Sequence, residues 1–375
     1  MEKTEKKIEK KDKTSDKIKE LEELISKTKY NKSTQHAIGL YKAQLAKLKE
    51  KRIARSSKGG KGEGYSVRKT GDGTVILLGF PSVGKSTLLN ALTNADSPVG
   101  DYAFTTLTVI PGTLEYNYAK IPILDVPGVV HGAAAGTGRG REVLAVIRNA
   151  DLILILIDVF DPEHYAALAK EVYETGVRLN QKRPNVKITK TGKGGISVGT
   201  TVKLSKIDKK TVQDVMREFK ITNANIIIRE DIDVDQLIDC IEDNKIYLPK
   251  LVVLNKIDMM GKNDLKKIQA IVKPDISISA ERSVHIDELK EFIFSKLNLI
   301  RIYLKEYNKK ADLDEPMIMF KSCTLMDLCH KLHKDFEVKF KFAKIWGKSA
   351  KYPGQKMVKL EHVLIDGDIV ELRMN

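Results

Sequence analysis

The stretch from Val75 to Leu92, VILLGFPSVGKSTLLNAL, decides the fold of this chain. Its first four residues are apolar and predict a buried strand, whereas the residues from Thr87 onward predict a helix. Between them, residues 79–86 match the phosphate-loop pattern G-x-x-x-x-G-K-[ST]. Glycines in such a loop let the backbone curl until successive N–H groups point at phosphate oxygens. The stretch therefore predicts a strand–loop–helix unit that binds nucleoside phosphates.

Each part of the loop has an expected role in that site. The Lys85 ammonium is expected to neutralise the β- and γ-phosphates, which makes it a candidate catalytic group, and the Ser86 hydroxyl is placed to bind Mg²⁺. The remaining nucleotide contacts are expected from Gly79, Ser82, Val83, Gly84 and Thr87. A glycine-rich turn without a ligand is the alternative interpretation, and the flanking strand and helix count against it.

The motif Asp125-Val126-Pro127-Gly128 directly follows the apolar run 121–124. Its aspartate can hold a metal ion through a water molecule, and the Gly128 N–H can meet the γ-phosphate. Asp125 is therefore a second candidate metal ligand beside Ser86. An ordinary turn aspartate is the alternative for Asp125.

A second motif, Asn255-Lys256-Ile257-Asp258, ends the apolar run 251–254 and points to the base. A carboxylate at Asp258 can accept two hydrogen bonds from the edge of a guanine ring, which adenine cannot donate. Ser279-Ala280 follows the run 276–278 and is placed to donate a backbone N–H to the guanine oxygen. Together with the phosphate loop, these motifs predict binding of GTP and GDP.

The regions outside these motifs indicate several domains. Residues 5–28 and 33–54 predict two amphipathic helices, because apolar residues recur at steps of three and four. Residues 56–73 contain glycines among lysines, which is typical of a flexible linker. From Thr74 onward, short apolar runs alternate with helical segments, so we expect an α/β fold with a parallel sheet covered by helices on both faces.

The interval between Asp158 and Leu251 is too long for one crossover helix. A helix is expected over 162–179, and the rest predicts an inserted α+β subdomain with strand-like residues 186–204, a helix near 211–219 and a strand at 226–228. After Asn298, a third region is expected to be a compact β-rich domain with one helix. Its strand-like stretches are 316–320 and 339–346, and its helical stretch is 324–333.

Charge is spread unevenly along the 375 residues, whose net charge is +15. Residues 1–70 carry +11, residues 71–300 are neutral, and residues 301–375 carry +4. Basic ends around a neutral centre indicate contact with a polyanion, with a lysine-rich solvated surface as the alternative. The chain has no apolar run of ~20 residues and no apolar leader, so neither a membrane protein nor a secreted one is expected. Three cysteines without C-x-x-C spacing indicate a reducing cytoplasm.

Two clusters are candidates for RNA contact. Lysines at 339, 341, 344, 348 and 351 interleave with Phe340, Phe342, Trp346 and Tyr352. Alternation at period two predicts lysines on one face of a strand and aromatic rings on the other, with a half-buried strand as the alternative to an RNA surface. In the insertion, Lys182, Arg183, Lys187, Lys190 and Lys193 form a second basic cluster. No feature indicates DNA specificity.

Hydrolysis is expected to be slow. Ras-like proteins carry a water-orienting Gln after the glycine that corresponds to Gly128, whereas this chain has Val129 there, which cannot hold water by hydrogen bonding. The Gly-rich residues 132–140 are typical of a switch that reorders when the γ-phosphate is lost. His131 is a weak candidate for orienting water. Arg139 or Arg141 can supply charge to the transition state, with a phosphate or RNA contact as an equal alternative.

The phosphate loop, the segment Tyr102–Leu107 and Asp-Val-Pro-Gly resemble the Obg-related GTPases. The resemblance extends over nearly the whole chain to the developmentally regulated GTP-binding (DRG) proteins, including Lys193–Ile196 and Trp346–Ser349. It implies an N-terminal helical domain (1–55), a linker (56–73), a G domain (74–180 and 246–298), the inserted subdomain (181–245) and a C-terminal TGS domain of β-grasp type (299–375). TGS domains are associated with RNA and ribosome-linked proteins.

The resemblance also implies roles for individual residues. Thr106 is expected to be the switch threonine that completes the Mg²⁺ shell, with Thr105 as a rival, and it joins Lys85 and Gly128 as a catalytic candidate. Some relatives use K⁺ in place of an arginine, and Ser82 departs from the Asn of the best-known cation-dependent loops, so K⁺ stays an open alternative. Eukaryotic relatives bind a stabilising partner protein.

We therefore expect a cytoplasmic GTPase that hydrolyses GTP slowly and acts as a switch on ribosomes or RNA in translation. A GTP-binding scaffold with little hydrolysis is one alternative. An RNA-binding protein with a vestigial G domain is another, and the intact Lys85, Asp125 and Asp258 count against it.

Overall fold

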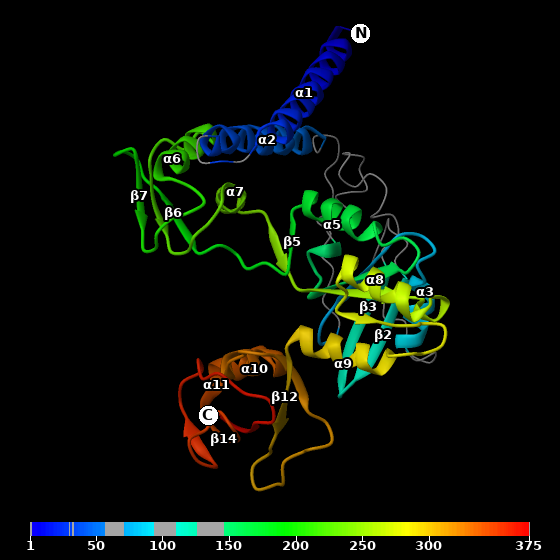
Figure 1. Ribbon diagram of the computed structural model, residues 1–375. Helices are drawn as coiled ribbons and strands as arrows, with labels where there is room; N and C mark the ends of the chain where they lie inside the picture. Colours follow the sequence, from blue (N-terminus) through cyan, green and yellow to red (C-terminus); the bar gives the residue numbers. More distant parts are fainter. Residues whose placement is uncertain are drawn as a thin grey trace. The chain divides into compact units, whose positions relative to one another are not determined.

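The computed structural model describes residues 2–29, 31, 34–56, 71–93, 110–125 and 146–374 (Figure 1). They divide into two compact units. One unit comprises the N-terminal helices and residues 172–247, and the other comprises residues 71–171, as far as they are described, and 248–374. Most of the expected linker, residues 57–70, lies outside the described residues.

A six-stranded sheet forms the centre of the second unit, in the order β11-β10-β4-β1-β3-β2. Every apolar run predicted as a strand is a strand. The strands are β1 (Val75–Leu78), β2 (Ile110–Tyr116), β3 (Ala119–Asp125), β4 (Leu152–Asp158), β10 (Lys250–Asn255) and β11 (Ile276–Ser277). The pairs from β11 to β3 are parallel, and the unpredicted β2 pairs antiparallel with β3 at the edge.

Both faces of this sheet are covered, as predicted. Every residue of β1 and β4 is buried, whichever face its side chain takes. The accompanying helices are α3 (Lys85–Leu92), α5 (His164–Glu174), the 3₁₀ helix η1 (Ile257–Met259), α8 (Lys262–Val272) and α9 (Ile286–Leu297). Leu88 and Leu289 join strand residues in one core, so α3 and α9 pack on the same sheet.

The helix expected over 162–179 ends earlier than predicted. Helix α5 stops at Glu174, and β5 (Val177–Leu179) follows it and pairs with β9 (Ile246–Leu248). Gly176 separates them with a φ of 93°, a left-handed conformation that ends a helix. The prediction was wrong because the apolar spacing continued through this glycine.

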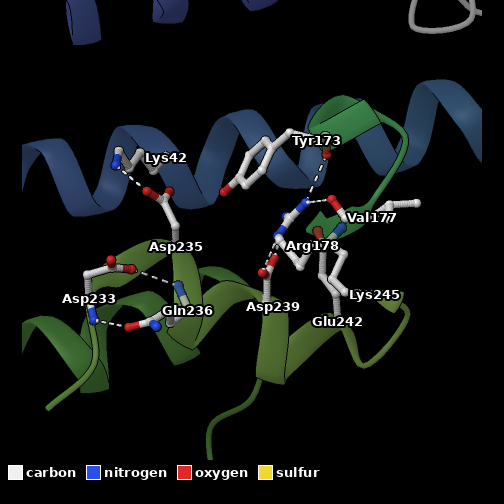
Figure 2. Close-up of polar contacts among 10 residues, drawn as sticks. All are labelled: Lys42, Tyr173, Val177, Arg178, Asp233, Asp235, Gln236, Asp239, Glu242 and Lys245. Atoms are coloured by element: carbon white, nitrogen blue, oxygen red, sulfur yellow. Dashed lines mark hydrogen bonds and ion pairs between the residues drawn. The ribbon is translucent and has the colours of Figure 1, made fainter. Parts of the chain in front are cut away.

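The inserted residues form the expected α+β structure. Strands β6 (Val186–Lys190), β8 (Ala224–Ile228) and β7 (Ile196–Thr200) make a three-stranded sheet in that order. Helix α6 (Lys209–Glu218) is close to its predicted position, and α7 (Val234–Glu242) is an additional helix. Asp233 and Gln236 form a reciprocal capping box at the start of α7 (Figure 2).

The two N-terminal helices, α1 (Glu2–Lys27) and α2 (Gln35–Ser56), belong to the same unit as the insertion. Ala43 of α2 is fully buried in one core with residues of α6 and α7. Lys42 contacts Asp235 at 2.6 Å, and His36 contacts Asp214 at 2.8 Å. The regions expected as separate N-terminal and inserted domains therefore share one core.

A buried ion pair lies at the base of the insertion (Figure 2). Arg178 of β5 donates from Nε and Nη2 to the two carboxylate oxygens of Asp239 on α7, at 2.6 and 2.7 Å. The two side chains are 5% and 6% exposed. Arg178 also donates to the Tyr173 carbonyl at 2.8 Å, and its Cζ lies 3.7 Å from the centre of the Tyr173 ring. This pair ties strand β5 to helix α7.

The C-terminal region is a five-stranded sheet in the order β13-β12-β16-β14-β15. Its strands are β12 (Leu299–Leu304), β13 (Met317–Phe320), β14 (Phe340–Trp346), β15 (Gln355–Met357) and β16 (Ile369–Met374). Two helices occur, α10 (Leu325–Leu332) and α11 (Lys334–Lys339), where one was predicted. His333, in extended conformation, separates them, and its side chain accepts from the Asp335 N–H.

The lysines and aromatic rings of β14 do not separate onto two faces as predicted. Ala343 and Ile345 are fully buried in the core of this region, which places Phe342, Lys344 and Trp346 together on the opposite face. The strand register also shifts between Phe340 and Phe342. The prediction was wrong because Ala343 and Ile345, rather than Phe342 and Trp346, fill the core.

Candidate nucleotide site

The phosphate loop has the geometry of an anion site. It joins β1 to α3, and Gly84 precedes the helix with a φ of 93°. No side chain caps the start of α3, so its first N–H groups are available to a ligand. A Cβ at Gly84 would lie 2.5 Å from Nδ2 of Asn255, which explains the requirement for glycine there.

Lys85 lies across this loop. Its Nζ donates to the carbonyl oxygens of Gly79 and Phe80, both at 3.0 Å. Gly79 sits close to β4, since a Cβ there would lie 2.7 Å from the carbonyl oxygen of Leu156. The ammonium is thus held at the mouth of the loop, where phosphate oxygens would compete for it. Ser86 and Thr87 are exposed in the first turn of α3.

Asp125 ends β3 and lies level with Leu77 of β1. It is only 5% exposed, and within the described ranges its buried Oδ1 has no hydrogen-bond partner. Burial raises the pKa of this carboxyl, and the charge of Lys85 opposes that shift. A buried carboxylate oxygen without a partner, near enough to Lys85 of the phosphate loop to feel its charge, fits the oxygen ligands that Mg²⁺ prefers. Ser86 and Asp125 would hold the metal.

Asn255 joins the phosphate loop to the loop after β11. Its Nδ2 donates to the Val83 carbonyl at 3.0 Å, and its Oδ1 accepts from the Ala280 N–H at 3.0 Å. The side chain is buried. Asn255 therefore positions two loops of the site. Ser279-Ala280 was predicted to donate one backbone N–H to guanine, but both of its N–H groups are engaged within the protein, because the Ser279 N–H donates to the Val284 carbonyl.

Lys256 makes a second connection to the phosphate loop. Its Nζ donates to the Ser82 carbonyl at 2.7 Å and to Oδ2 of Asp158 at 3.2 Å. Asp158 was not singled out from the sequence, although it directly follows the apolar run 152–157 just as Asp125 follows its own. It is buried, and its other oxygen accepts from the Asp161 N–H.

Asp258 lies in η1, next to Ser279. A hydrogen bond from the Ser279 side chain is the main cause that lowers the pKa of Asp258, so its carboxylate is ionised at neutral pH. Oδ2 also lies 3.3 Å from Nε of Arg282. The carboxylate is thus ionised and able to accept hydrogen bonds from a base once Arg282 moves away. The hydrogen bond from Lys256 to Ser82 joins the motif that contains Asp258 to the phosphate loop, although these two residues are 174 positions apart in the chain.

Several predicted residues lie outside the described residues. They are Thr105 and Thr106, Gly128, Val129, His131, Arg139 and Arg141, so the roles expected for them stay predictions. In the described ranges, no helix has both the length and the apolar character that crossing a membrane requires.

Three family descriptions match consecutive parts of the chain. They are "50S ribosome-binding GTPase" over residues 74–190, "C-terminal region of MMR_HSR1 domain" over 193–299 and "TGS domain" over 300–374. The last match confirms the predicted C-terminal TGS domain.

Relatives match nearly the full length. An uncharacterized GTP-binding protein of Methanocaldococcus jannaschii is 51% identical over 95% of this chain and 91% of its own length. Developmentally-regulated GTP-binding protein 1 of Xenopus laevis is 43% identical over 95% of this chain and 97% of its own. A solved YchF GTPase of Schizosaccharomyces pombe is 14% identical, covering 82% of this chain and 99% of its own, with a TM-score of 0.44. The chain belongs to the developmentally regulated GTP-binding proteins, a family of GTPases related to Obg.

Proposed function

We propose that this protein hydrolyses GTP slowly to GDP and phosphate with Mg²⁺, and acts in the cytoplasm as a nucleotide-dependent switch on ribosomes or RNA during translation. The observation that carries the nucleotide part is the position of Asn255. Its side chain bonds to both the phosphate loop and the loop beside Asp258, so the phosphate and base halves form one site.

In the proposed reaction, water attacks the γ-phosphorus and the bond to the β–γ bridging oxygen breaks, which leaves GDP and phosphate. The chain's own part is to position the triphosphate and to offset its growing negative charge. The N–H groups at the start of α3 bind phosphate oxygens, and Lys85 exchanges the carbonyls of Gly79 and Phe80 for them. Mg²⁺, held by Ser86 and Asp125, would neutralise charge on the β- and γ-phosphates.

Slow turnover is proposed from the identity of Val129, whose aliphatic side chain cannot orient the attacking water. Thr106 is proposed to complete the Mg²⁺ shell and the Gly128 N–H to meet the γ-phosphate, and both segments are proposed to carry the switch. K⁺ assistance of hydrolysis is an alternative, although Ser82 stands where the best-known cation-dependent loops have Asn. A second factor, such as the ribosome, would then complete the site.

For the ribosome or RNA, we propose the face of β14 that carries Phe342, Lys344 and Trp346. Lys356 lies over the Phe342 ring at 4.3 Å, and Lys305 lies over the Trp346 ring at 4.3 Å. Aromatic rings with neighbouring cations suit stacked bases and phosphates. The family description "50S ribosome-binding GTPase" is consistent with this partner. Binding should weaken steeply as salt rises, and a flat salt response would contradict it.

The base assignment is tested by Asp258→Asn. The variant should lose affinity for GTP and gain affinity for xanthosine triphosphate, whose ring edge presents an acceptor where guanine has an amino donor. Thr87→Ala, an exposed change in the same site region, serves as control and should retain the preference for GTP. Unchanged GTP affinity in Asp258→Asn would show that the base contact is misassigned.

Hydrolysis is tested by single-turnover measurements with and without ribosomes, each in K⁺ and in Na⁺. We expect a slow basal rate that ribosomes increase, and loss of the rate in Lys85→Ala. Rates at background in all four conditions would favour a GTP-binding scaffold. Ribosome co-sedimentation with GTP, GDP and a non-hydrolysable analogue tests the switch, which requires nucleotide-dependent binding.

A further inference from the structure

The carboxylate proposed to select guanine already has a partner within the chain. Nε of Arg282 lies 3.3 Å from Oδ2 of Asp258. The Asp258 side chain is 10% exposed, whereas that of Arg282 is 70% exposed. The arginine therefore approaches the carboxylate from the solvent side.

Arg282 is held in place by the same residue that supports Asp258. Its backbone N–H donates to Oγ of Ser279 at 3.2 Å, and the Ser279 side chain also hydrogen-bonds Asp258. Ser279 and Val284 exchange backbone hydrogen bonds in both directions, which closes a tight turn with Arg282 inside it. The turn fixes the backbone of Arg282 near the carboxylate and leaves its long side chain free to swing away.

The chemistry of the two partners makes them competitors. A guanine edge offers a ring N–H and an amino N–H on one carbon, and a guanidinium offers two N–H groups on one carbon in the same way. Both fit the two oxygens of one carboxylate. Asp258 cannot satisfy both partners at once with the same oxygens.

We infer that Arg282 is an internal competitor of guanine: its guanidinium occupies Asp258 until a guanine nucleotide displaces it, and so lowers guanine nucleotide affinity and favours exchange. This inference depends on the proposed guanine site. The contact is a single one at 3.3 Å from an arginine that is 70% exposed, so it is weak and the competition costs only a modest factor in affinity. That size suits a residue that adjusts exchange without preventing binding.

The test compares GDP dissociation constants of the full-length protein, measured by titration with a fluorescent GDP, at low and high salt. Arg282→Ala should bind GDP about two- to fivefold more tightly than wild type at low salt, and the difference should shrink at high salt as the ion pair is screened. Arg217→Ala is the matched control, because Arg217 is also an exposed arginine paired with an aspartate, in the other unit. It should leave GDP binding unchanged.

A second comparison separates competition for Asp258 from a general loss of positive charge. In the Asp258→Asn background, Arg282→Ala should have no effect on the affinity for xanthosine diphosphate, since the carboxylate is already gone. Equal or weaker GDP binding by Arg282→Ala would overturn the inference, as would the same gain in the Asp258→Asn background. Failure of the wild type to bind GDP would instead refute the proposed function.

Discussion

The buried ion pair between Arg178 and Asp239 gives the sharpest stability prediction. Asp239→Asn keeps the size of the side chain but leaves the guanidinium buried without a counter-charge. Removing one partner of a buried pair costs about 3–5 kcal/mol. The remaining hydrogen bond from Arg178 to the Tyr173 carbonyl does not supply a charge, so we expect a loss within that range.

Local stability is the quantity to measure, because a chain of several domains does not unfold in one step. Hydrogen exchange followed by mass spectrometry should show faster exchange in peptides covering β5 and α7, by about 10²–10⁴-fold, since each ~1.4 kcal/mol is a factor of ten. Peptides from β1, in the other unit, should be unaffected.

The matched control is Asp243→Asn at the end of α7. Asp243 pairs with Arg183, but both side chains are about two-thirds exposed, at 66% and 67%, so the same chemical change should cost little. Arg178→Met combined with Asp239→Leu should recover much of the lost protection, because no buried charge remains. If Asp239→Asn alters exchange no more than Asp243→Asn does, the reasoning about this pair is wrong.

Three further changes have defined outcomes. Gly84→Ala should abolish nucleotide binding in titrations, because the new Cβ would collide with Nδ2 of Asn255 and the backbone would leave its left-handed conformation. Gly347→Ala should destabilise the C-terminal domain by about 1–3 kcal/mol and lower its melting temperature, because the new Cβ would lie 2.1 Å from Oδ1 of the buried Asp368. An unchanged melting curve would contradict this. Burial raises the pKa of the Asp125 carboxyl, so its charged form destabilises the fold, and Asp125→Asn should raise the melting temperature in the absence of nucleotide and Mg²⁺. For the same reason the wild type should gain stability as the pH falls and Asp125 takes up a proton. The same variant should lose Mg²⁺-dependent GTP binding, and a fall in melting temperature would count against the assignment.

The G domain was predictable because its signals are local. About ten consecutive residues are enough to recognise each of its features: the strand at 75–78, the loop with Gly84 and Lys85, and the aspartates that follow apolar strands. Asp158 gives the same kind of signal, an aspartate at the end of an apolar run, and was passed over because no known motif surrounds it.

Other features depend on contacts that no local pattern records. The packing of α2 against α6 and α7 involves contacts such as the ion pair between Lys42 and Asp235, which are 193 residues apart in the chain. The face taken by Trp346 was decided by which residues of β14 the core could accept. Asn255 was expected to contact the nucleotide, whereas its hydrogen bonds run to two loops of the protein.

The shared core of α2 with α6 and α7 has a consequence for how the protein is made. During synthesis α2 leaves the ribosome well before its partner helices, and the 193 residues between Lys42 and Asp235 take roughly 10–40 s to translate. Throughout that delay Ala43, which is fully buried among residues of α6 and α7 in the finished protein, lacks those packing partners. The nascent chain must therefore carry an unprotected apolar surface past the completion of most of its G domain, which makes this helix a natural client for chaperones at the tunnel exit.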